Sequence, residues 1–119
     1  MMPQVSSLRE RRRDGSATRV GVTITGDVSP AEQVDVLAEF EELSRDAGLG
    51  MRPARCRIEA RVNGDSLSNV DAVMILGDGR VLFAWSVERT MHGALRTVSR
   101  RLHAQVDAAS RRPALDQTA

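Results

Sequence analysis

Arginine is the residue type with the clearest chemical potential in this chain, and it is concentrated near the end. Positions 89 to 112 hold six arginines and one acid, Asp107, so this segment carries about +5 in a chain whose formal net charge is +1. A guanidinium group pairs with phosphate through two parallel hydrogen bonds. All 17 basic residues are arginine, as a GC-rich coding sequence would also produce, so their position is more informative than their identity. The segment predicts contact with an anionic partner.

The other reactive side chains do not form a catalytic group. His92 and His103 are eleven residues apart on one predicted helix, so they lie about 16 Å apart along its axis and cannot share a metal ion. Cys56 is the only cysteine, and its apolar-facing position in a predicted strand favours burial over reactivity. The Gly-Asp-Gly triplet at 77–79 lacks the following helix and lysine of a phosphate-binding loop. We therefore expect no enzyme activity, no metal and no cofactor.

The segment from 90 to 112 has the periodicity of an amphipathic helix. Its apolar residues recur at intervals of three and four, which places them on one stripe. These residues are Met91, Ala94, Leu95, Val98, Leu102, Val106 and Ala109. The opposite side carries His92, Arg96, Arg100, His103 and Arg111. One side of the helix is expected to pack, and the other to face the anionic partner.

Upstream of this helix, the pattern predicts a strand and a further helix. The sequence RVGVTITG, which starts at Arg19, alternates in hydropathy and ends at Gly26, as a strand does. Ser29 followed by Pro30 is a favourable helix start, and an apolar period continues from there. We expect a first helix over 30–47, with most of its charges acidic.

Three more strands are expected before the last helix. The run ARCRIEARV alternates, with Arg55, Arg57 and Arg61 on its outer face. The runs NVDAVMILG and RVLFAWSVE are joined by the Gly-Asp-Gly turn, which predicts a tight hairpin. Phe83 and Trp85 share one face of the last strand, and we expect them to supply the two largest rings of the core.

This order of elements predicts an α+β fold of the βαβββα type. The first helix makes a crossover connection, so the strands on either side of it should be parallel and the later strands antiparallel. The result is a four-stranded mixed sheet with two helices packed on one face and the other face open to solvent.

Length and composition indicate one folded domain. A chain of 119 residues with 41 % hydrophobic and 28 % charged residues has the size and composition of a single globular domain. We expect it over 19–112, between a disordered basic N-terminal arm at 1–18 and a polar tail at 113–119. No apolar run approaches the roughly 18 to 20 residues of a membrane span, and the start lacks the apolar segment of a secretory signal. We therefore expect a cytoplasmic protein with no membrane partner.

The closing helix has a pattern of spaced residues: Met91, Ala94, Leu95, Leu102 and Gln105, with an arginine at 101. In this pattern the chain resembles the ribosome hibernation factors, also called ribosome-associated inhibitors or sigma-54 modulation proteins. The last helix of that family opens with Asp-Met-Tyr, continues with Ala-Ile-Asp and later has Lys-Leu and Gln-Leu pairs. The run VTITGDVSP and the Gly-Asp-Gly hairpin are also similar, so the resemblance covers about residues 19–110. Thr90, His92 and Arg96 stand where the family has Asp, Tyr and Asp.

The resemblance implies a protein that performs no chemistry of its own. Proteins of that family bind the small ribosomal subunit in the channel used by mRNA and tRNA and thereby block translation. The implied partner is therefore the small subunit with its 16S rRNA. The implied RNA-binding residues are Arg89, Arg96, Arg100, Arg101 and Arg111, with His92 and His103 as secondary contacts and Arg55, Arg57 and Arg61 as a second patch.

An alternative function belongs to a different class. A chain with the same fold that has lost ribosome binding would be an interaction module. Its acidic first helix and basic last helix would then serve self-association, as a homodimer, or contact with another protein. A small enzyme is a third hypothesis, but it would need convergent polar groups around a pocket, which the strand faces do not offer.

Overall fold

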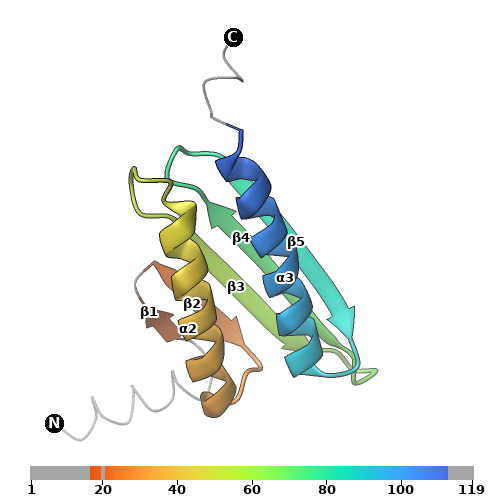
Figure 1. Ribbon diagram of the computed structural model, residues 1–119. Coiled ribbons are helices and arrows are strands. Elements are labelled where there is room, and N and C mark those ends of the chain that lie inside the picture. Colours follow the sequence, from red (N-terminus) through yellow and green to blue (C-terminus); the bar gives the residue numbers. More distant parts are fainter. Residues whose placement is uncertain (1–16, 20, 113–119) are drawn as a thin grey trace, which may run out of the picture.

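The computed structural model describes residues 17–19 and 21–112. Within them it contains two long helices and one sheet (Figure 1). The elements in chain order are β1 (Ala17–Arg19), β2 (Val22–Gly26), α2 (Pro30–Ala47), β3 (Arg55–Val62), β4 (Ser68–Ile75), β5 (Val81–Glu88) and α3 (Met91–Ser110). The predicted N-terminal arm and C-terminal tail lie outside the described residues except at positions 17 and 18.

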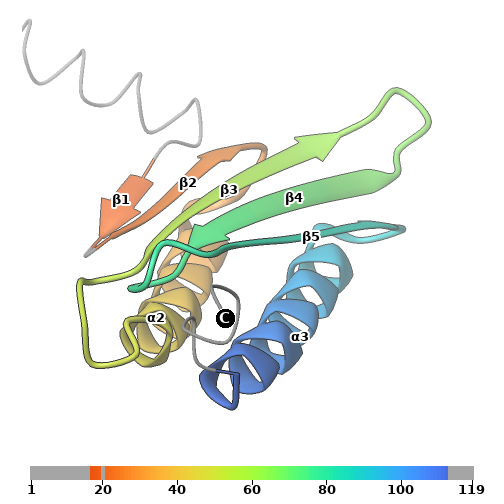
Figure 2. The ribbon, with the colours of Figure 1, turned by 90° about the horizontal axis from the view of Figure 1, so that it is seen from above.

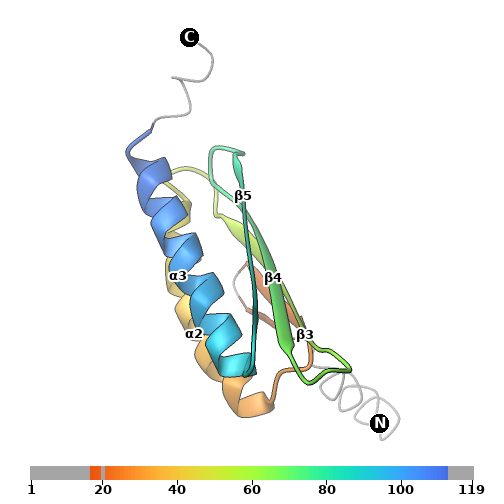
Figure 3. The ribbon, with the colours of Figure 1, turned by 90° about the vertical axis from the view of Figure 1, so that its right-hand side faces the viewer.

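The strands lie in the sheet in the order β1-β2-β3-β4-β5. The pair β2 and β3 is parallel, as expected from the α2 crossover, and every other neighbouring pair is antiparallel. Both helices cover the same face of the sheet, and no element of the described residues covers the opposite face, which is called the open face (Figures 2 and 3). The predicted βαβββα fold, with a four-stranded mixed sheet and two helices, is confirmed, and β1 extends that sheet at its β2 edge.

The first predicted strand is divided in two. Instead of running from Arg19 to Gly26, it forms β1 and β2, which pair with Arg19 opposite Val22. The reversal contains Gly21, whose φ of 80° is accessible to glycine but unfavourable for other residues. A side chain at this position would also approach the carbonyl oxygen of Ala54 to 2.8 Å. The alternation of apolar residues continues across this turn, which is why it predicts one strand.

Both helices begin at the positions that the sequence predicts. The Ser29 hydroxyl accepts a hydrogen bond from the amide of Glu32 at 3.2 Å, and Pro30 is the first helical residue of α2. The Thr90 hydroxyl accepts from the amide of Gly93 at 3.0 Å and caps α3. Each cap satisfies one of the amides that lack a partner in the first turn of a helix.

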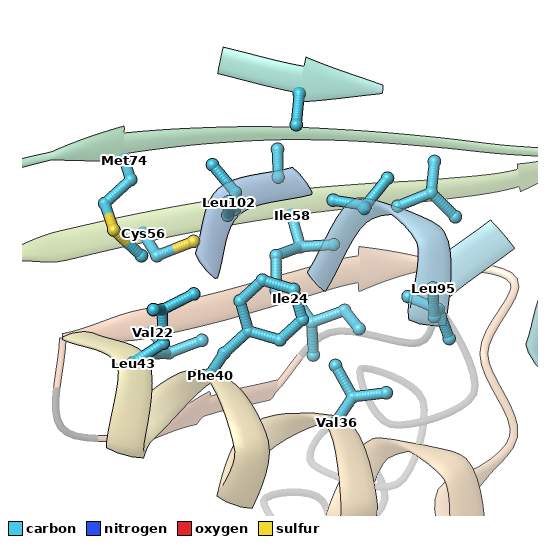
Figure 4. Packing of buried hydrophobic residues seen from close by; sticks show 14 of the residues in the cluster. Val22, Ile24, Val36, Phe40, Leu43, Cys56, Ile58, Met74, Leu95 and Leu102 are labelled. Atoms are coloured by element: carbon cyan, nitrogen blue, oxygen red, sulfur yellow. The ribbon is translucent and has the colours of Figure 1, made fainter. Parts of the chain in front are cut away.

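The core lies between the sheet and the two helices (Figure 4). Phe40 and Leu43 of α2 pack towards β2, whose Ile24 is fully buried. Leu102 of α3 is likewise fully buried over the sheet. Removing this apolar area from water is the main stabilising contribution to the fold. The largest fully buried apolar side chains are Phe40, Ile24, Leu43, Ile58, Met74, Leu102, Val22, Val70 and Val98.

The prediction that Phe83 and Trp85 lie in the core is wrong. Phe83 and Trp85 share a face, as expected, but that face is the open one, and each residue is 52 % exposed. The residues that β5 turns towards α3 are Leu82, Ala84 and Ser86. Small side chains at 84 and 86 let the helix approach the sheet closely, and Leu95 and Leu102 of α3 supply the packed volume from the helix side.

Cys56 is buried in β3, as predicted. Burial raises the pKa of its thiol to about 12 because the thiolate would lose its hydration. The thiol therefore stays protonated at neutral pH and packs as a small apolar group.

The close approach of β2 to β3 at Gly26 yields a stability prediction. A Cβ atom at this position would lie 1.8 Å from the carbonyl oxygen of Ala60, and the φ of Gly26 is 111°. Gly50 also has a positive φ, of 71°, but a Cβ there would meet no atom within 4 Å. We expect Gly50→Ala to lower the free energy of unfolding by about 1 kcal/mol and Gly26→Ala by about 3 kcal/mol or more, measured by urea denaturation. Equal losses in the two variants would contradict the contact.

Candidate nucleic-acid interface

The ten predicted RNA-binding residues do not form one surface. Arg55, Arg57 and Arg61 are exposed on the open face of the sheet, whereas the residues of α3 lie on the helix side. The sheet separates the two sets (Figure 3). One flat stretch of RNA therefore cannot contact both sets on the same molecule at once.

The outward side of α3 carries Arg96, Arg100 and Arg111, all exposed. Arg96 and Arg100 are one turn apart, about 6 Å along the axis. Arg100 donates to the Thr97 hydroxyl at 3.3 Å. Arg111 pairs with Asp107 at 2.8 Å, which offsets part of its charge. Arg96 forms no ion pair within the described residues, whereas the charge of Arg100 is partly offset by the nearby Glu88 carboxylate.

Arg101 has a different position from its neighbours. Its guanidinium donates to the backbone carbonyl of Trp85, on the outer edge of β5. Gln105, one turn later, donates to the carbonyl of Phe83 at 3.0 Å. These two side chains of α3 thus satisfy the backbone of an edge strand, which protects it from pairing with another chain. Arg89 is exposed in the short connection between β5 and α3.

The two histidines lie on the side of α3 that faces α2. The Nδ1 of His92 is 3.0 Å from Glu32 Oε2 of α2, and the two groups form an ion pair when His92 is protonated. The Nδ1 of His103 is 3.0 Å from the carbonyl oxygen of Ser99. A carbonyl only accepts, so Nδ1 of His103 carries the proton and Nε2 remains for another partner.

The neighbouring helix α2 is acidic where it borders α3. Glu39 accepts a hydrogen bond from the Ser99 hydroxyl at 2.7 Å, in addition to the contact of Glu32 with His92. Further carboxylates of α2, at Asp35, Glu42 and Asp46, are exposed. The helix side of the molecule is therefore divided into an acidic half and a basic half, and a phosphate group is favoured only near the basic half.

A polar network joins the end of β5 to α3. The Glu88 carboxylate accepts hydrogen bonds from the hydroxyls of Thr97 and of Ser86, the latter at 3.0 Å. The Thr97 bond is the largest cause of a lowered pKa for Glu88, followed by the Ser86 bond and the charges of Arg100 and Arg101. This network holds the first turns of α3 against the strand and thereby positions Arg100.

Arg80 is a structural arginine that the sequence pattern did not identify. Its guanidinium bonds Asp78 at 2.7 and 2.8 Å and donates to the carbonyl oxygen of Ala109 at 2.9 Å. The hydrogen bond from Arg80 also holds the pKa of Asp78 below its usual range. The contact ties the β4–β5 turn to the negative end of the α3 dipole. The presence of Asp78 two residues before Arg80 could have indicated their ion pair from the sequence. The contact with Ala109 depends on the tertiary fold and could not.

No metal site or membrane-spanning helix is found within residues 17–19 and 21–112. No three His, Cys, Asp or Glu side chains there converge as metal ligands. Neither described helix is long and apolar enough to cross a bilayer. A shallow groove of about 460 Å³ between the ends of α2 and α3 is lined by His103, Asp46 and Asp107 among others.

Solved structures of other proteins share this fold. The N-terminal domain of Protein Y from Thermus thermophilus has a TM-score of 0.56 and 15 % sequence identity, and the match covers 67 % of this chain and 83 % of that one. A ribosomal subunit interface protein from Coxiella burnetii has a TM-score of 0.51 and 20 % identity, over 72 % of this chain and 89 % of that one. No family model matches the chain, and neither does any curated protein sequence. The likeness therefore lies in the fold.

The Glu88 network predicts a pH-dependent contribution to stability. Because the pKa of Glu88 is lowered in the folded chain, its contribution is present above the unfolded-state pKa and disappears as the pH falls through the folded-state value. We expect Glu88→Gln to destabilise the protein at about pH 7, and the difference from wild type to shrink as the pH falls below the unfolded-state value of 4.5. Denaturation at each pH measures this. Glu42→Gln, an exposed control on α2, should cause little change at any of these values, and a pH-independent loss in Glu88→Gln would contradict the role of the charge.

Proposed function

We propose that this protein is a translation inhibitor of the ribosome hibernation type. It binds the small ribosomal subunit in the cytoplasm, contacts 16S rRNA through arginines and acts without catalysis. The observation that carries the proposal is the exposed arginine pair of α3, Arg96 and Arg100, on a fold shared with a ribosomal subunit interface protein.

The physical basis is neutralisation of phosphate charge. Arginines that contact the RNA backbone displace counterions and supply affinity without reading the base sequence. Folded RNA is recognised largely by shape and backbone contacts, which suits a rigid two-layer protein. This function does not require a pocket lined by convergent polar groups.

The charge of α2 restricts the direction of approach. Its exposed carboxylates at Asp35, Glu42 and Asp46 repel phosphate, so the RNA meets α3 from the side of β5. On that side lie Arg100 and Arg101, with Arg89 at the start of the helix. The α2 side keeps His92 and His103 as secondary contacts.

The other assigned residues contribute unequally. Arg111 is partly neutralised by Asp107, so we give it less weight than Arg96 and Arg100. The second patch, Arg55, Arg57 and Arg61, lies on the opposite layer and serves a separate segment of RNA.

The acidic face of α2 favours a second candidate function. A protein-interaction or self-association module of the same fold would use the α2 carboxylates to contact a basic partner. Under this alternative the protein would not travel with ribosomal subunits at any salt concentration.

Sedimentation with purified small subunits tests the leading proposal. We expect the Arg96→Ala, Arg100→Ala double variant to bind more weakly, with the slope of log K against log salt reduced by about 2, because two phosphate contacts are lost. Arg101 is left intact because it also holds the β5 edge.

The matched control removes the same charge elsewhere. Arg45 and Arg52 are exposed on α2 and in the following loop, outside the proposed interface. The Arg45→Ala, Arg52→Ala variant should keep the wild-type slope. No association of wild type with small subunits at low salt would refute the proposal, and equal losses in both variants would refute the assignment to α3.

A further inference from the structure

The open face of the sheet carries an apolar stripe that the proposed function does not use. Val81 is 62 % exposed, and Phe83 and Trp85 are each 52 % exposed. Three flanking residues, Val87, Val73 and Ile75, are between 37 and 43 % exposed. All six side chains lie on the same face of β4 and β5, opposite the helices. These six side chains form the apolar stripe.

Strand register orders this face into rows. Phe83 is paired with Val73, and Val73 is paired with Arg57 of β3. In the next row, Trp85 is paired with Asp71, and that residue with Glu59. Neighbouring strands are about 4.8 Å apart and successive residues on one face about 7 Å apart. A basic row and an acidic row therefore lie side by side, and each ends in an aromatic ring.

The edge of β5 is closed, whereas its face is open. The carbonyl groups of Phe83 and Trp85 accept hydrogen bonds from Gln105 and Arg101 of α3. A partner strand that paired with this edge would have to break both bonds. The apolar stripe is thus available for face-to-face packing and not for strand addition.

We propose that the apolar stripe is the interface of a homodimer, in which a second copy of this chain packs against it sheet to sheet. The two-fold axis crosses the strands at the level of Ile58, Ala72 and Ala84, which are paired with one another. This axis lies between the two rows. It places Phe83 of each protomer against Trp85 of the other.

The same axis brings one pair of opposite charges together near its centre. It sets Arg57 of one protomer over Glu59 of its partner, and the symmetry repeats the contact. A two-fold interface must be self-complementary in this way. Arg57 and Glu59 lie one residue on either side of Ile58 and meet this requirement. The axis also sets Asp71 over Val73 and Arg55 over Arg61 of the partner, and these two arginines lie near the ends of β3.

The area is adequate for a specific dimer. The exposed fractions of the six residues correspond to about 500 Å² of apolar surface, at the upper end for the largest patch of a monomer. A specific interface buries about 800 Å² on each partner. Arg55, Arg57, Glu59, Asn69 and Asp71 border the apolar stripe on the β3 and β4 side and supply the remaining area as a polar rim.

Nucleic acid is a less suitable occupant of the same face. Aromatic residues on a sheet can stack unpaired bases, provided that cations follow the backbone beside them. Here the residue beside Trp85 is Asp71, and the next is Glu59, so phosphates would meet two carboxylates. Arg57 is separated from Phe83 by the whole width of β4.

The dimer is independent of RNA contact through α3. It leaves the helix side of both protomers exposed. On the open face it covers Arg57 and thereby part of the second patch. Failure of one proposal therefore does not entail failure of the other.

Sedimentation velocity of the full chain over a range of concentrations tests the dimer. We expect the weight-average mass to rise from monomer to dimer between about 1 and 100 μM, the range of a modest interface. Trp85 is the only tryptophan, so its emission should shift to shorter wavelength over the same range as the ring is buried.

Matched variants locate the interface. Phe83→Thr with Trp85→Thr should weaken the dimer at least tenfold while keeping strand propensity. Val34→Thr with Met51→Thr removes two apolar side chains of 61 and 66 % exposure outside the apolar stripe. This variant should leave the affinity of the dimer unchanged. Circular dichroism melting confirms that each variant is folded.

A charge exchange tests the two-fold axis. Arg57→Glu and Glu59→Arg should each weaken the dimer severalfold, because they place like charges opposite one another. The double variant exchanges the rows and should restore most of the affinity.

Several results would overturn the proposal. These are a monomer at every concentration, a dimer that survives the Phe83 and Trp85 changes, or an equal loss in the Val34 and Met51 control. Quenching of Trp85 by a single-stranded oligonucleotide in a protein that stays monomeric would instead assign the face to nucleic acid.

Discussion

The register of β5 is the constraint on which the rest of the structure depends. Side chains alternate along a strand, so the strand cannot turn Ala84 and Ser86 towards α3 without turning Phe83 and Trp85 to solvent. The gain is close contact between α3 and the sheet, since Ala72 lies beside Ala84 and neither side chain holds the helix away. Leu95, Val98 and Leu102 then fill the space from the helix side. The cost is a pair of large rings in contact with water.

The position of α3 has a second consequence, at the sheet edge. The helix lies close enough to β5 for Arg101 and Gln105 to reach backbone carbonyls of that strand, while Arg80 reaches back to the end of the helix. Part of the arginine excess near the end of the chain is therefore structural. Counting cations along a helix overestimates the charge available to a ligand, because some guanidinium groups already serve as donors within the fold. The surface charge of α3 is concentrated at Arg96 and Arg100.

Much of the architecture could be predicted from local patterns, because those patterns report local physics. Ser29 and Thr90 cap the helices as their side chains predict, and the Gly-Asp-Gly turn joins β4 to β5. Which face of β5 packs against α3 could not be predicted in this way. Both faces contain apolar residues, and the face with the larger side chains is the exposed one. The site was predicted less well than the fold. Whether Arg101 meets RNA or a carbonyl of its own chain depends on the distance between a helix and a strand, and periodicity contains no information about that distance.

The two layers of the fold give the protein two surfaces that act separately. The helix side is charged and divided between α2 and α3, which suits recognition that depends on salt and on direction. The open face is apolar at β5 and mixed in charge at β3, which suits recognition by shape and desolvation. If two copies pack through the apolar stripe, their helix layers lie on the outside, and each retains Arg96 and Arg100 for contact with RNA. The dimer and RNA contact through the sheet arginines then exclude each other, because Arg57 cannot meet a carboxylate of the partner and a phosphate at once. The open face would decide the oligomeric state, and α3 would set the affinity for RNA.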